Sequence, residues 1–356
     1  MNAGTAAGSR GAAGMPRAGR PEFLAIVGCT GAGKTALSLR VARRIGAEII
    51  SMDSRQVYRG MDIGTAKATH HERALVPHHG LDLRDPGQRY SAGEFGRDAR
   101  RWIRDIRARG RVPLLVGGTG FFLRVLTDPI FREPPLDGAR RARLERALGA
   151  LPRAELERWM RVLDPERVAA LSGPGGYQRM IRTVTVTLLT GRKLSWWHVR
   201  HPTGADPLRG VVCRLRVPRG ALGERIDRRV RAMVEAGFRD EVAGLLAAGY
   251  SPGDPGMDGV GYREMAEHLA GRITREEAVE RTRRATRRYA KRQRTWFRHQ
   301  LGPDAVVVDG TVPPAAQAEV VVGAWRARAG RVEEAAPGVA GPARTAGEPA
   351  GAEAAR

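Results

Sequence analysis

Short apolar runs alternate along the chain with longer segments in which hydrophobic residues recur at helical spacing. The run Phe23 to Val27 leads through a glycine-rich turn into an expected helix from Lys34 to Ile45, and a second strand pattern follows at Glu48 to Ser51. A strand, a turn, a helix and a strand at this short spacing are typical of a parallel βαβ unit. The run 112–116 is apolar throughout, which favours a strand covered on both faces of a parallel sheet.

The alternation continues to the end of the chain. Ser91, with Glu94 three residues later, forms a capping-box pattern for a helix that is expected to end near Arg109, where Gly110 supplies a stop signal. Strand-like sequence returns at 211–217. The remaining expected elements are helices at 222–248, 263–269 and 275–299, a strand at 305–308 and a closing helix to about 327.

The segment from about 136 to 191 differs, because it is charged, of helical period and free of strand patterns. We therefore predict an α/β fold in which a parallel-sheet core flanked by helices, residues 22–135 and 205–326, carries an all-helical insertion at 136–200. Residues 1–21 and 327–356 consist mostly of Gly, Ala, Pro and charged residues with little to bury, so we expect disordered tails there.

The charge balance indicates a polyanionic partner. The 356-residue chain carries 61 Lys and Arg against 38 Asp and Glu, a formal net charge of +23. Cys29 and Cys213 lie far apart and lack the C-x-x-C spacing of a zinc site, which favours the reducing cytoplasm. No apolar run reaches the roughly 18 residues that span a bilayer, so we expect no membrane association. The acid-free, Arg-bearing start also fits an organelle transit peptide, an alternative that its low Ser content disfavours.

One motif carries specific chemistry. The segment GCTGAGKT follows the first expected strand, precedes a helix and matches the phosphate-binding pattern G-x-x-x-x-G-K-[ST] (a P-loop). In such a cradle the backbone amides face an anion, the Lys supplies a point charge to the terminal phosphate, and the Thr hydroxyl can ligate Mg²⁺. The cradle residues are Gly28, Cys29, Thr30, Gly31, Ala32, Gly33, Lys34 and Thr35.

The motif alone does not name the phosphate compound, and ATP is the default. However, the strand at 112–116 ends in Gly117-Gly118-Thr119 and not in the acidic residue that holds Mg²⁺ in motor-type ATPases. An acidic residue, Asp53, instead follows the second strand. Because ligands of α/β sheets bind at the carboxyl ends of the strands, we expect Asp53 to face the cradle. The alternative is a helix cap or turn residue, since Asp is common in both.

The run from Ser51 to Thr69, SMDSRQVYRGMDIGTAKAT, resembles the signature of the tRNA dimethylallyltransferases, also called tRNA isopentenyltransferases or IPP transferases. The chain lacks the carboxyl-terminal zinc finger of eukaryotic members and so is similar to the bacterial form. Further blocks that look like this family are HHGLDLRDPGQRYSAGEF (78–95), LLVGGTGFF (114–122), QRMIR (178–182), VGYRE (260–264) and KRQRTWFR (291–298).

The resemblance implies transfer of a dimethylallyl group from dimethylallyl diphosphate to N6 of adenine 37, beside the anticodon of tRNA. It makes Asp53 the general base and gives Thr35 an assisting role through the diphosphate and its Mg²⁺. Arg225 becomes a candidate diphosphate ligand, and Arg229 a weaker one. The tRNA contacts that it implies are Asp53, Ser54, Arg55, Gln56, Thr119, Arg141, Gln178, Arg179, Met180, Ile181, Arg182, Lys291, Arg292, Gln293, Arg294, Thr295, Trp296, Phe297 and Arg298.

The last long helix supports an RNA partner, because the stretch 281–298 contains nine Lys or Arg and no acid. A solvated charged face is the alternative for such a run, and Tyr289, Trp296 and Phe297 could be either RNA platforms or core anchors. The basic residues at 140–146 of the insertion are equally open between a tRNA grip and a solvated helix. The histidines at 70, 71, 78 and 79 lack the pattern of a metal site.

Two other functions remain from the residues alone. A small-molecule P-loop kinase would use Asp53 to orient an acceptor hydroxyl, but the basic helix and the absence of a recognisable ATP lid argue against it. An RNA-binding P-loop ATPase is disfavoured because the carboxylate follows the cradle so closely in sequence. We expect a cytoplasmic monomer whose partners are tRNA, through its anticodon stem-loop, and dimethylallyl diphosphate.

Overall fold

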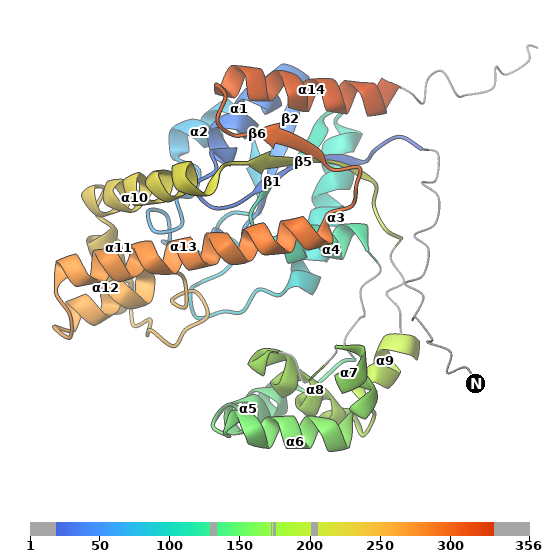
Figure 1. Cartoon of the computed structure of the whole chain (residues 1–356), viewed down its shortest axis with the longest axis vertical. Coiled ribbons are helices and arrows are strands. Elements are labelled where there is room, and N and C mark those ends of the chain that lie inside the picture. The colour runs from blue at the N-terminus through green and yellow to red at the C-terminus, as the bar shows by residue number, and fades with distance from the viewer. Residues whose placement is uncertain (1–18, 129–133, 172, 174–175, 201–205, 331–356) are drawn as a thin grey trace, which may run out of the picture.

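The computed structural model describes residues 19–128, 134–171, 173, 176–200 and 206–330. A six-stranded, all-parallel sheet with the order β3-β2-β4-β1-β5-β6 forms the centre of the larger part of the molecule (Figure 1). The predicted α/β fold is confirmed. The strands are β1 (Phe23–Gly28), β2 (Ala47–Met52), β3 (His78–His79), β4 (Val112–Gly117), β5 (Gly210–Arg216) and β6 (Val306–Asp309).

The central strands of the sheet are covered on both faces, as the apolar runs predicted. Leu24 and Ile26 of β1 join one core cluster with residues of α1 (Lys34–Ile45) and α14 (Pro314–Gly330). Ala25 and Val27, which point to the opposite face, join a second cluster with α3 (Ala92–Ala108) and α4 (Gly120–Thr127). Successive residues of a strand point to opposite faces, and all four of these side chains are fully buried.

The carboxyl-terminal half adds helices beside the strand ends: α10 (Arg219–Glu235), α11 (Phe238–Ala247), α12 (Tyr262–Leu269) and the long α13 (Arg275–Gln300). The single helix expected over 222–248 was wrong. The chain breaks between α10 and α11 at Gly237, whose φ of 96° is left-handed and therefore suits glycine. Two short elements, α2 (His70–Leu75) and β3, carry too few residues to show a period and were not expected.

The insertion is all-helical, as predicted, and Figure 1 shows it as a separate green bundle below the sheet. It has its own small core, built from Leu148, Leu156, Met160, Met180, Ile181 and Val184. Its helices are α5 (Gly138–Gly149), α6 (Arg153–Leu163), α7 (Pro165–Ala170), α8 (Tyr177–Thr190) and α9 (Leu194–Arg200).

The expected tails fall almost entirely outside the described residues. Helix α14 continues to Gly330, beyond residue 327, where the second tail was expected to begin. Residues 1–18 and 331–356 are not described. In the described part of the chain, none of the helices combines the length and the apolar character that crossing a bilayer requires.

Candidate active site at the phosphate cradle

The cradle is the loop between β1 and α1, at the carboxyl edge of the sheet. Its chain reverses through Gly31 and Gly33, whose φ values of 78° and 99° lie in the left-handed region that side chains rarely adopt. Gly33 precedes α1 and provides no side-chain cap, so the first amides of that helix are left for a ligand. An anion at this place would also meet the positive end of the helix dipole.

Helix α13 supports the cradle through Gln293. The backbone N–H of Thr30 donates to Oε1 of Gln293 over 2.8 Å, and Nε2 of Gln293 donates to the carbonyl of Gly118 over 3.0 Å. Gln293 is only 6% exposed. The expectation that its side chain grips tRNA is therefore corrected, because both ends of the amide are committed to the protein backbone.

Asp53 follows β2 and lies opposite the cradle. Its Oδ1 accepts from the backbone N–H of Arg55 over 2.8 Å, so Asp53 has the turn role that the sequence also allowed. A cavity of about 340 Å³, which we call the central cavity, is lined by Asp53 together with Thr30, Lys34 and Thr35 of the cradle. The expected approach of Asp53 to the cradle is thus found.

Electrostatics in the central cavity favour an anion. Burial, and after it the charge of the neighbouring Arg229, lower the pKa of Lys34 to about 8, although the charge of Asp53 acts in the opposite direction. Burial also lowers the pKa of Arg229. Two cations held in a poorly solvated space cost free energy unless a counter-charge joins them. A diphosphate in the cradle would supply that charge.

The hydroxyl of Tyr289, on α13, also belongs to this site. Burial and, after it, the charge of Asp53 raise the pKa of Tyr289 to about 12. The side chain lines the central cavity, so at neutral pH it presents a protonated hydroxyl beside Asp53. Of the three aromatics whose role the sequence left open, Tyr289 lies at the site. Phe297 is buried in the core, and Trp296 packs over Gly120.

Arg225 was expected to be the stronger diphosphate ligand of α10 and Arg229 the weaker one, but their positions indicate the reverse. Arg225 donates to the carbonyls of Ala32 and Gly310, over 3.2 and 2.8 Å, and is not among the residues that line the central cavity. Arg229, one turn later, does line it and donates to the carbonyl of Thr65 over 3.2 Å. Arg225 therefore supports the cradle from behind, and Arg229 is the arginine that a ligand would meet.

Cys29 contributes only its backbone to the cradle. Its side chain is buried, and Sγ lies 3.4 Å from the carbonyl of Ala290, on the side of α13. Its carbonyl accepts from Nζ of Lys34 over 2.9 Å. Both cysteines are free and buried.

An apolar wall, which the sequence analysis did not single out, completes the central cavity. Phe238 and Tyr262 meet edge to face with ring centroids 5.0 Å apart, and Val230 and Met233 of α10 lie beside them. These residues come from three helices, so no local period could have shown that they converge. A site with phosphate donors at one end and an apolar wall at the other fits an amphipathic phosphate ester.

A loop between Met61 and Lys67 closes one side of the cavity with Gly64, Thr65 and Ala66. The carboxylate of Glu241, on α11, accepts from the amides of Asp62, Ile63 and Gly64 over 2.8, 2.6 and 3.1 Å, and from the Tyr262 hydroxyl over 2.6 Å. One carboxylate thus fastens the loop to the apolar wall.

The other end of this loop is tied by Lys67, whose side chain is fully buried. Its Nζ donates to the carbonyl of Tyr58 and to the carboxylates of Asp62 and Asp82, over 2.6, 2.6 and 2.7 Å. Gln56 adds bonds to the carbonyls of Thr65 and Ala66. Asp62, whose role the sequence left open, ties down its loop, and Gln56 is a support of the cavity wall.

The remaining residues that were expected to contact tRNA fall into three groups: buried residues, residues that line the central cavity and residues that are at least partly exposed. Met180 and Ile181 are at most 4% exposed inside the insertion core, and Phe297 is 1% exposed, so the expectation that these side chains touch RNA is corrected. Ser54 and Arg55 line the central cavity, and the Thr119 hydroxyl accepts from the amide of Ser54. The exposed or half-buried members are Arg141, Gln178, Arg179, Arg182, Lys291, Arg292, Arg294, Thr295, Trp296 and Arg298.

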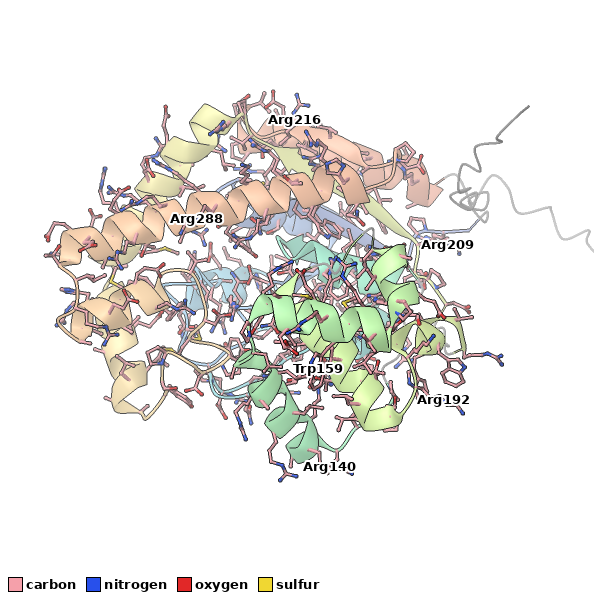
Figure 2. The ribbon with its side chains drawn as sticks, turned by 60° about the horizontal axis from the view of Figure 1, so that its bottom comes forward. Arg140, Trp159, Arg192, Arg209, Arg216 and Arg288 are labelled. Atoms are coloured by element: carbon pink, nitrogen blue, oxygen red, sulfur yellow. The ribbon has the colours of Figure 1, made fainter. Side chains whose placement is uncertain are left out.

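The sequence left open whether the basic run of α13 is a solvated face or an RNA surface, and the two halves of the helix differ in this respect. In the first half, Arg281, Arg283 and Arg284 pair with glutamates, as a solvated face would. In the second half, Arg288 and Lys291 form no hydrogen bond or ion pair with a described residue. Figure 2 shows arginines projecting both from this helix, at Arg288, and from the insertion, at Arg140 and Arg192.

Of the four histidines considered in the sequence, His78 and His79 make contacts that suit a structural role. Nδ1 of His78 lies 2.7 Å from the carbonyl of Val76, and Nε2 of His79 lies 2.8 Å from the buried carboxylate of Glu48. Nowhere among the described residues do three His, Cys, Asp or Glu side chains gather as a metal cage requires.

Fold and site together define a P-loop protein with a helical insertion and a cavity lined by the cradle, a carboxylate and an apolar wall. Comparison with known proteins identifies the family. The family model described as IPP transferase matches residues 56–300, and the isopentenyl transferase model matches residues 21–76. The chain belongs to the IPP transferase family, as its sequence blocks indicated, and it is a prenyl-transferring enzyme of that family.

Relatives and solved structures agree. The chain is 42% identical over 290 residues to the tRNA dimethylallyltransferase of Desulfosudis oleivorans, covering 82% of this chain and 91% of the relative. It is 44% identical over 285 residues to that of Syntrophobacter fumaroxidans, covering 80% and 83% of the two chains.

Among solved structures, the tRNA isopentenylpyrophosphate transferase of Bacillus halodurans matches with a TM-score of 0.63 and 36% identity over 88% of this chain and 99% of its own. A eukaryotic dimethylallyltransferase acting on tRNA matches with a TM-score of 0.68 and 27% identity, over 87% and 77%. These matches favour neither the kinase nor the ATPase alternative.

Proposed function

We propose that this enzyme transfers the dimethylallyl group of dimethylallyl diphosphate to N6 of adenine 37 in tRNA. The observation that carries the proposal is that Asp53 and Lys34 line one cavity, close enough for the charge of Asp53 to act on Lys34. A base for the amine and a cation for the leaving group are therefore available in the same cavity. The names of the relatives support both substrates.

The donor binds with its diphosphate in the cradle, where the loop amides, Lys34 and Arg229 receive the phosphate oxygens. Its five-carbon chain lies along the apolar wall of Phe238, Tyr262 and Met233. Exclusion of water at this wall matters, because an allylic carbon that is losing its leaving group is also open to attack by water.

In the reaction, the N6 lone pair forms a bond to C1 of the allyl group while the bond from C1 to the diphosphate oxygen breaks. The electron pair of that bond leaves with the diphosphate, where Lys34 and Arg229 stabilise the growing charge. Asp53 takes the proton that the amine must lose, because an exocyclic adenine amine is a poor nucleophile without a base. The adenine leaves its stack in the anticodon loop to reach Asp53.

The residues present fit a magnesium ion. The Thr35 hydroxyl lines the central cavity and makes no hydrogen bond to a described residue, and Mg²⁺ is commonly held by one or two protein oxygens together with substrate phosphates. Thr35 and the diphosphate would hold the ion, which when bound supplies positive charge to the leaving diphosphate.

The tRNA contacts come from the exposed second half of α13 and from the insertion. Their arginines face solvent on both parts of the molecule (Figure 2), and this arrangement suits the backbone of an anticodon stem-loop. Two free, buried cysteines and a tRNA substrate support a cytoplasmic location.

The test is direct. The purified protein is incubated with radiolabelled dimethylallyl diphosphate, Mg²⁺ and undermodified tRNA, and the RNA is digested to nucleosides. We expect labelled N6-dimethylallyladenosine from tRNA with adenine 37 and none from tRNA with guanine there. Phosphate transfer from ATP without label in RNA would contradict the proposal.

The arrangement of α10 predicts different effects for its two arginines. Arg229→Ala should raise the KM for dimethylallyl diphosphate about 10- to 100-fold, because a hydrogen bond to a charged group is worth about 1.5–3 kcal/mol. Arg225→Ala removes bonds to backbone carbonyls and should mainly lower the melting temperature. Steady-state kinetics and thermal melting separate the two, and a larger KM effect for Arg225→Ala would overturn the assignment.

The fastening of the 61–67 loop gives a further prediction. Glu241→Ala leaves three loop amides without their acceptor, so we expect donor KM to rise about tenfold with a smaller change in kcat at saturating donor. Glu241→Gln, which keeps an acceptor oxygen, should recover part of the loss. The matched control is Asp240→Asn, whose exposed carboxylate pairs only with Arg239 in the described structure. Equal kinetics for Glu241→Ala and the control would exclude a role of Glu241 in holding the 61–67 loop for donor binding.

A further inference from the structure

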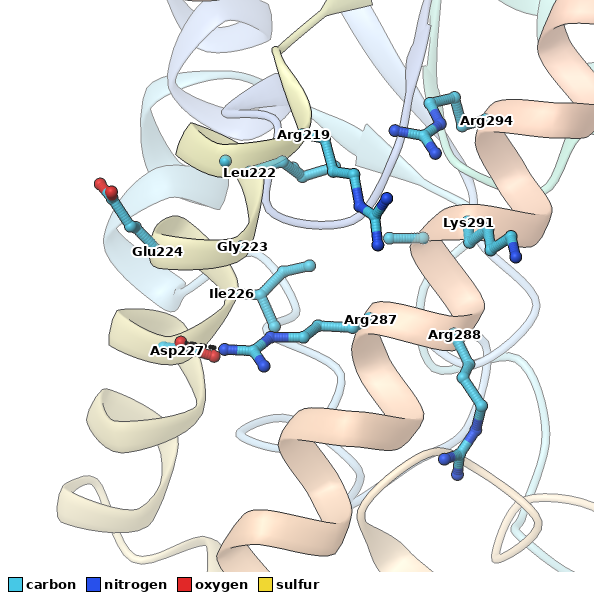
Figure 3. Close-up of a pocket in the computed structure, with 12 residues that line it drawn as sticks. Arg219, Leu222, Gly223, Glu224, Ile226, Asp227, Arg287, Arg288, Lys291 and Arg294 are labelled. Atoms are coloured by element: carbon cyan, nitrogen blue, oxygen red, sulfur yellow. Dashed lines mark hydrogen bonds and ion pairs between the residues drawn. The ribbon is translucent and has the colours of Figure 1, made fainter.

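A second hollow lies on the other flank of α13. It has a volume of about 590 Å³ and runs between α10 and α13, and we call it the α10–α13 groove (Figure 3). Its apolar floor includes Leu222, Ile226 and Ala290. Tyr289 and Gln293 face the central cavity, whereas Ala290, Lys291 and Arg294 face the groove. One helix therefore separates the two spaces.

Cations predominate in the groove. Arg219 comes from α10, and Arg287, Arg288, Lys291 and Arg294 come from α13, against the two carboxylates of Glu224 and Asp227. Asp227 is already paired with Arg287, as Figure 3 shows. Arg219, Arg288, Lys291 and Arg294 have no hydrogen bond or ion pair with any described residue.

The strand beside the groove adds to the excess of positive charge. Burial lowers the pKa of Arg214 on β5, Cys29 acts in the opposite direction, and the charges of Arg216, Arg294 and Arg298 lower the pKa further. Like charges that outnumber the neighbouring acids repel one another, so a bound polyanion would stabilise this arrangement. The whole chain likewise has an excess of basic over acidic residues, with a net charge of +23.

We propose that the α10–α13 groove binds an unpaired strand of the tRNA, on the side of α13 that is turned away from Asp53. From residue 287 to residue 294 the cationic wall extends about 10 Å along the helix, which is longer than one phosphate group and suits successive phosphates. The apolar floor offers a surface for an unstacked base, as single-strand RNA sites commonly do. Because a helix with its side chains is about 10–12 Å across, a strand next to the inserted adenine reaches the groove by crossing one helix.

The inference rests on the proposed function only in naming tRNA as the RNA, and it is tested by binding. The variant Arg219→Gln/Arg294→Gln breaks no internal bond of the described structure. Its tRNA Kd should rise about tenfold at 0.15 M salt, and the slope of log Kd against log salt should fall by about 1 to 2. The control Arg40→Gln/Arg43→Gln removes the same charge from exposed positions on α1 and should bind nearly as the unaltered protein does.

A site-directed cross-link locates the RNA. A Cβ at Gly223, in the groove, or at Gly244, on α11, meets no atom within 4 Å, so Gly223→Cys and Gly244→Cys can each carry a photoactivated benzophenone. We expect a cross-link to tRNA from the first position only, and excess unlabelled tRNA should abolish it.

Two outcomes would overturn the proposal. One is tRNA binding by the groove variant that equals that of the control, with no cross-link from position 223. The other is protection of the Gly223→Cys thiol from alkylation by inorganic diphosphate but not by tRNA, which would assign the groove to small anions. Prenyl transfer by the unaltered protein is measured on the same tRNA, so a failure of the proposed function is seen separately.

Discussion

Asp53→Asn is expected to lower kcat for prenyl transfer by about 10²- to 10⁴-fold, the usual contribution of a positioned general base. The asparagine keeps an oxygen for the Arg55 amide, which Oδ1 of Asp53 now accepts over 2.8 Å, so the local turn should persist. What is lost is the basicity that removes the amine proton. Single-turnover rates at saturating donor and tRNA measure this step.

The binding of tRNA should change little in the same variant. Asp258→Asn is a matched control, because Asp258 also lines the central cavity but its side chain is 62% exposed and pairs with Arg55 and Arg263. We expect that control to retain a rate within about threefold of the unaltered enzyme, since an exposed ion pair contributes little. Normal single-turnover chemistry in Asp53→Asn, with tRNA binding lost, would show that the carboxylate positions RNA and is not the base.

Lys34→Met should reduce kcat/KM for dimethylallyl diphosphate by about 10²- to 10³-fold, the cost of removing one donor to a developing negative charge. The methionine keeps the length of the side chain but cannot meet the leaving diphosphate. Lys193→Met removes an exposed lysine of the insertion, 43% exposed and paired with Glu166, and should leave the kinetics unchanged.

Stability distinguishes this effect from misfolding. Burial lowers the pKa of Lys34 to about 8, which means that the empty site holds its positive charge at a cost in free energy. Lys34→Met should therefore melt at the same temperature as the unaltered protein or higher in the absence of ligand, while the stabilisation that donor gives to the unaltered protein should shrink. A lower melting temperature without donor would contradict this account of the site.

Much of the fold follows from local patterns. The strand at Phe23 begins where the sequence indicated, and helix α1 covers the expected Lys34–Ile45. The capping box at Ser91 is formed, with its hydroxyl accepting from the amide of Glu94. These features depend on residues within a few positions of one another, and such short-range geometry can be derived from sequence.

The errors arise where distant parts of the chain meet. The family block at 178–182 contains two residues, Met180 and Ile181, that face the insertion core, and a block by itself does not separate buried positions from exposed ones. Gln293 lies in a basic run that resembles an RNA surface, yet its contacts are to Thr30 and Gly118, more than 170 residues away along the chain.

The sequence by itself determined the parallel α/β class, the cradle, the carboxylate after the second strand and the helical insertion, because each is a matter of spacing along the chain. Only the tertiary structure decided that Arg229 and not Arg225 meets the cavity. The two lie one helical turn apart, about 6 Å along the axis, and how far α10 is shifted along the cradle depends on packing against α13 and the 61–67 loop. The tertiary structure also decided that α13 separates the central cavity from the α10–α13 groove. The side chains that a helix buries set its rotation about its axis, and this rotation decides which residues face each space.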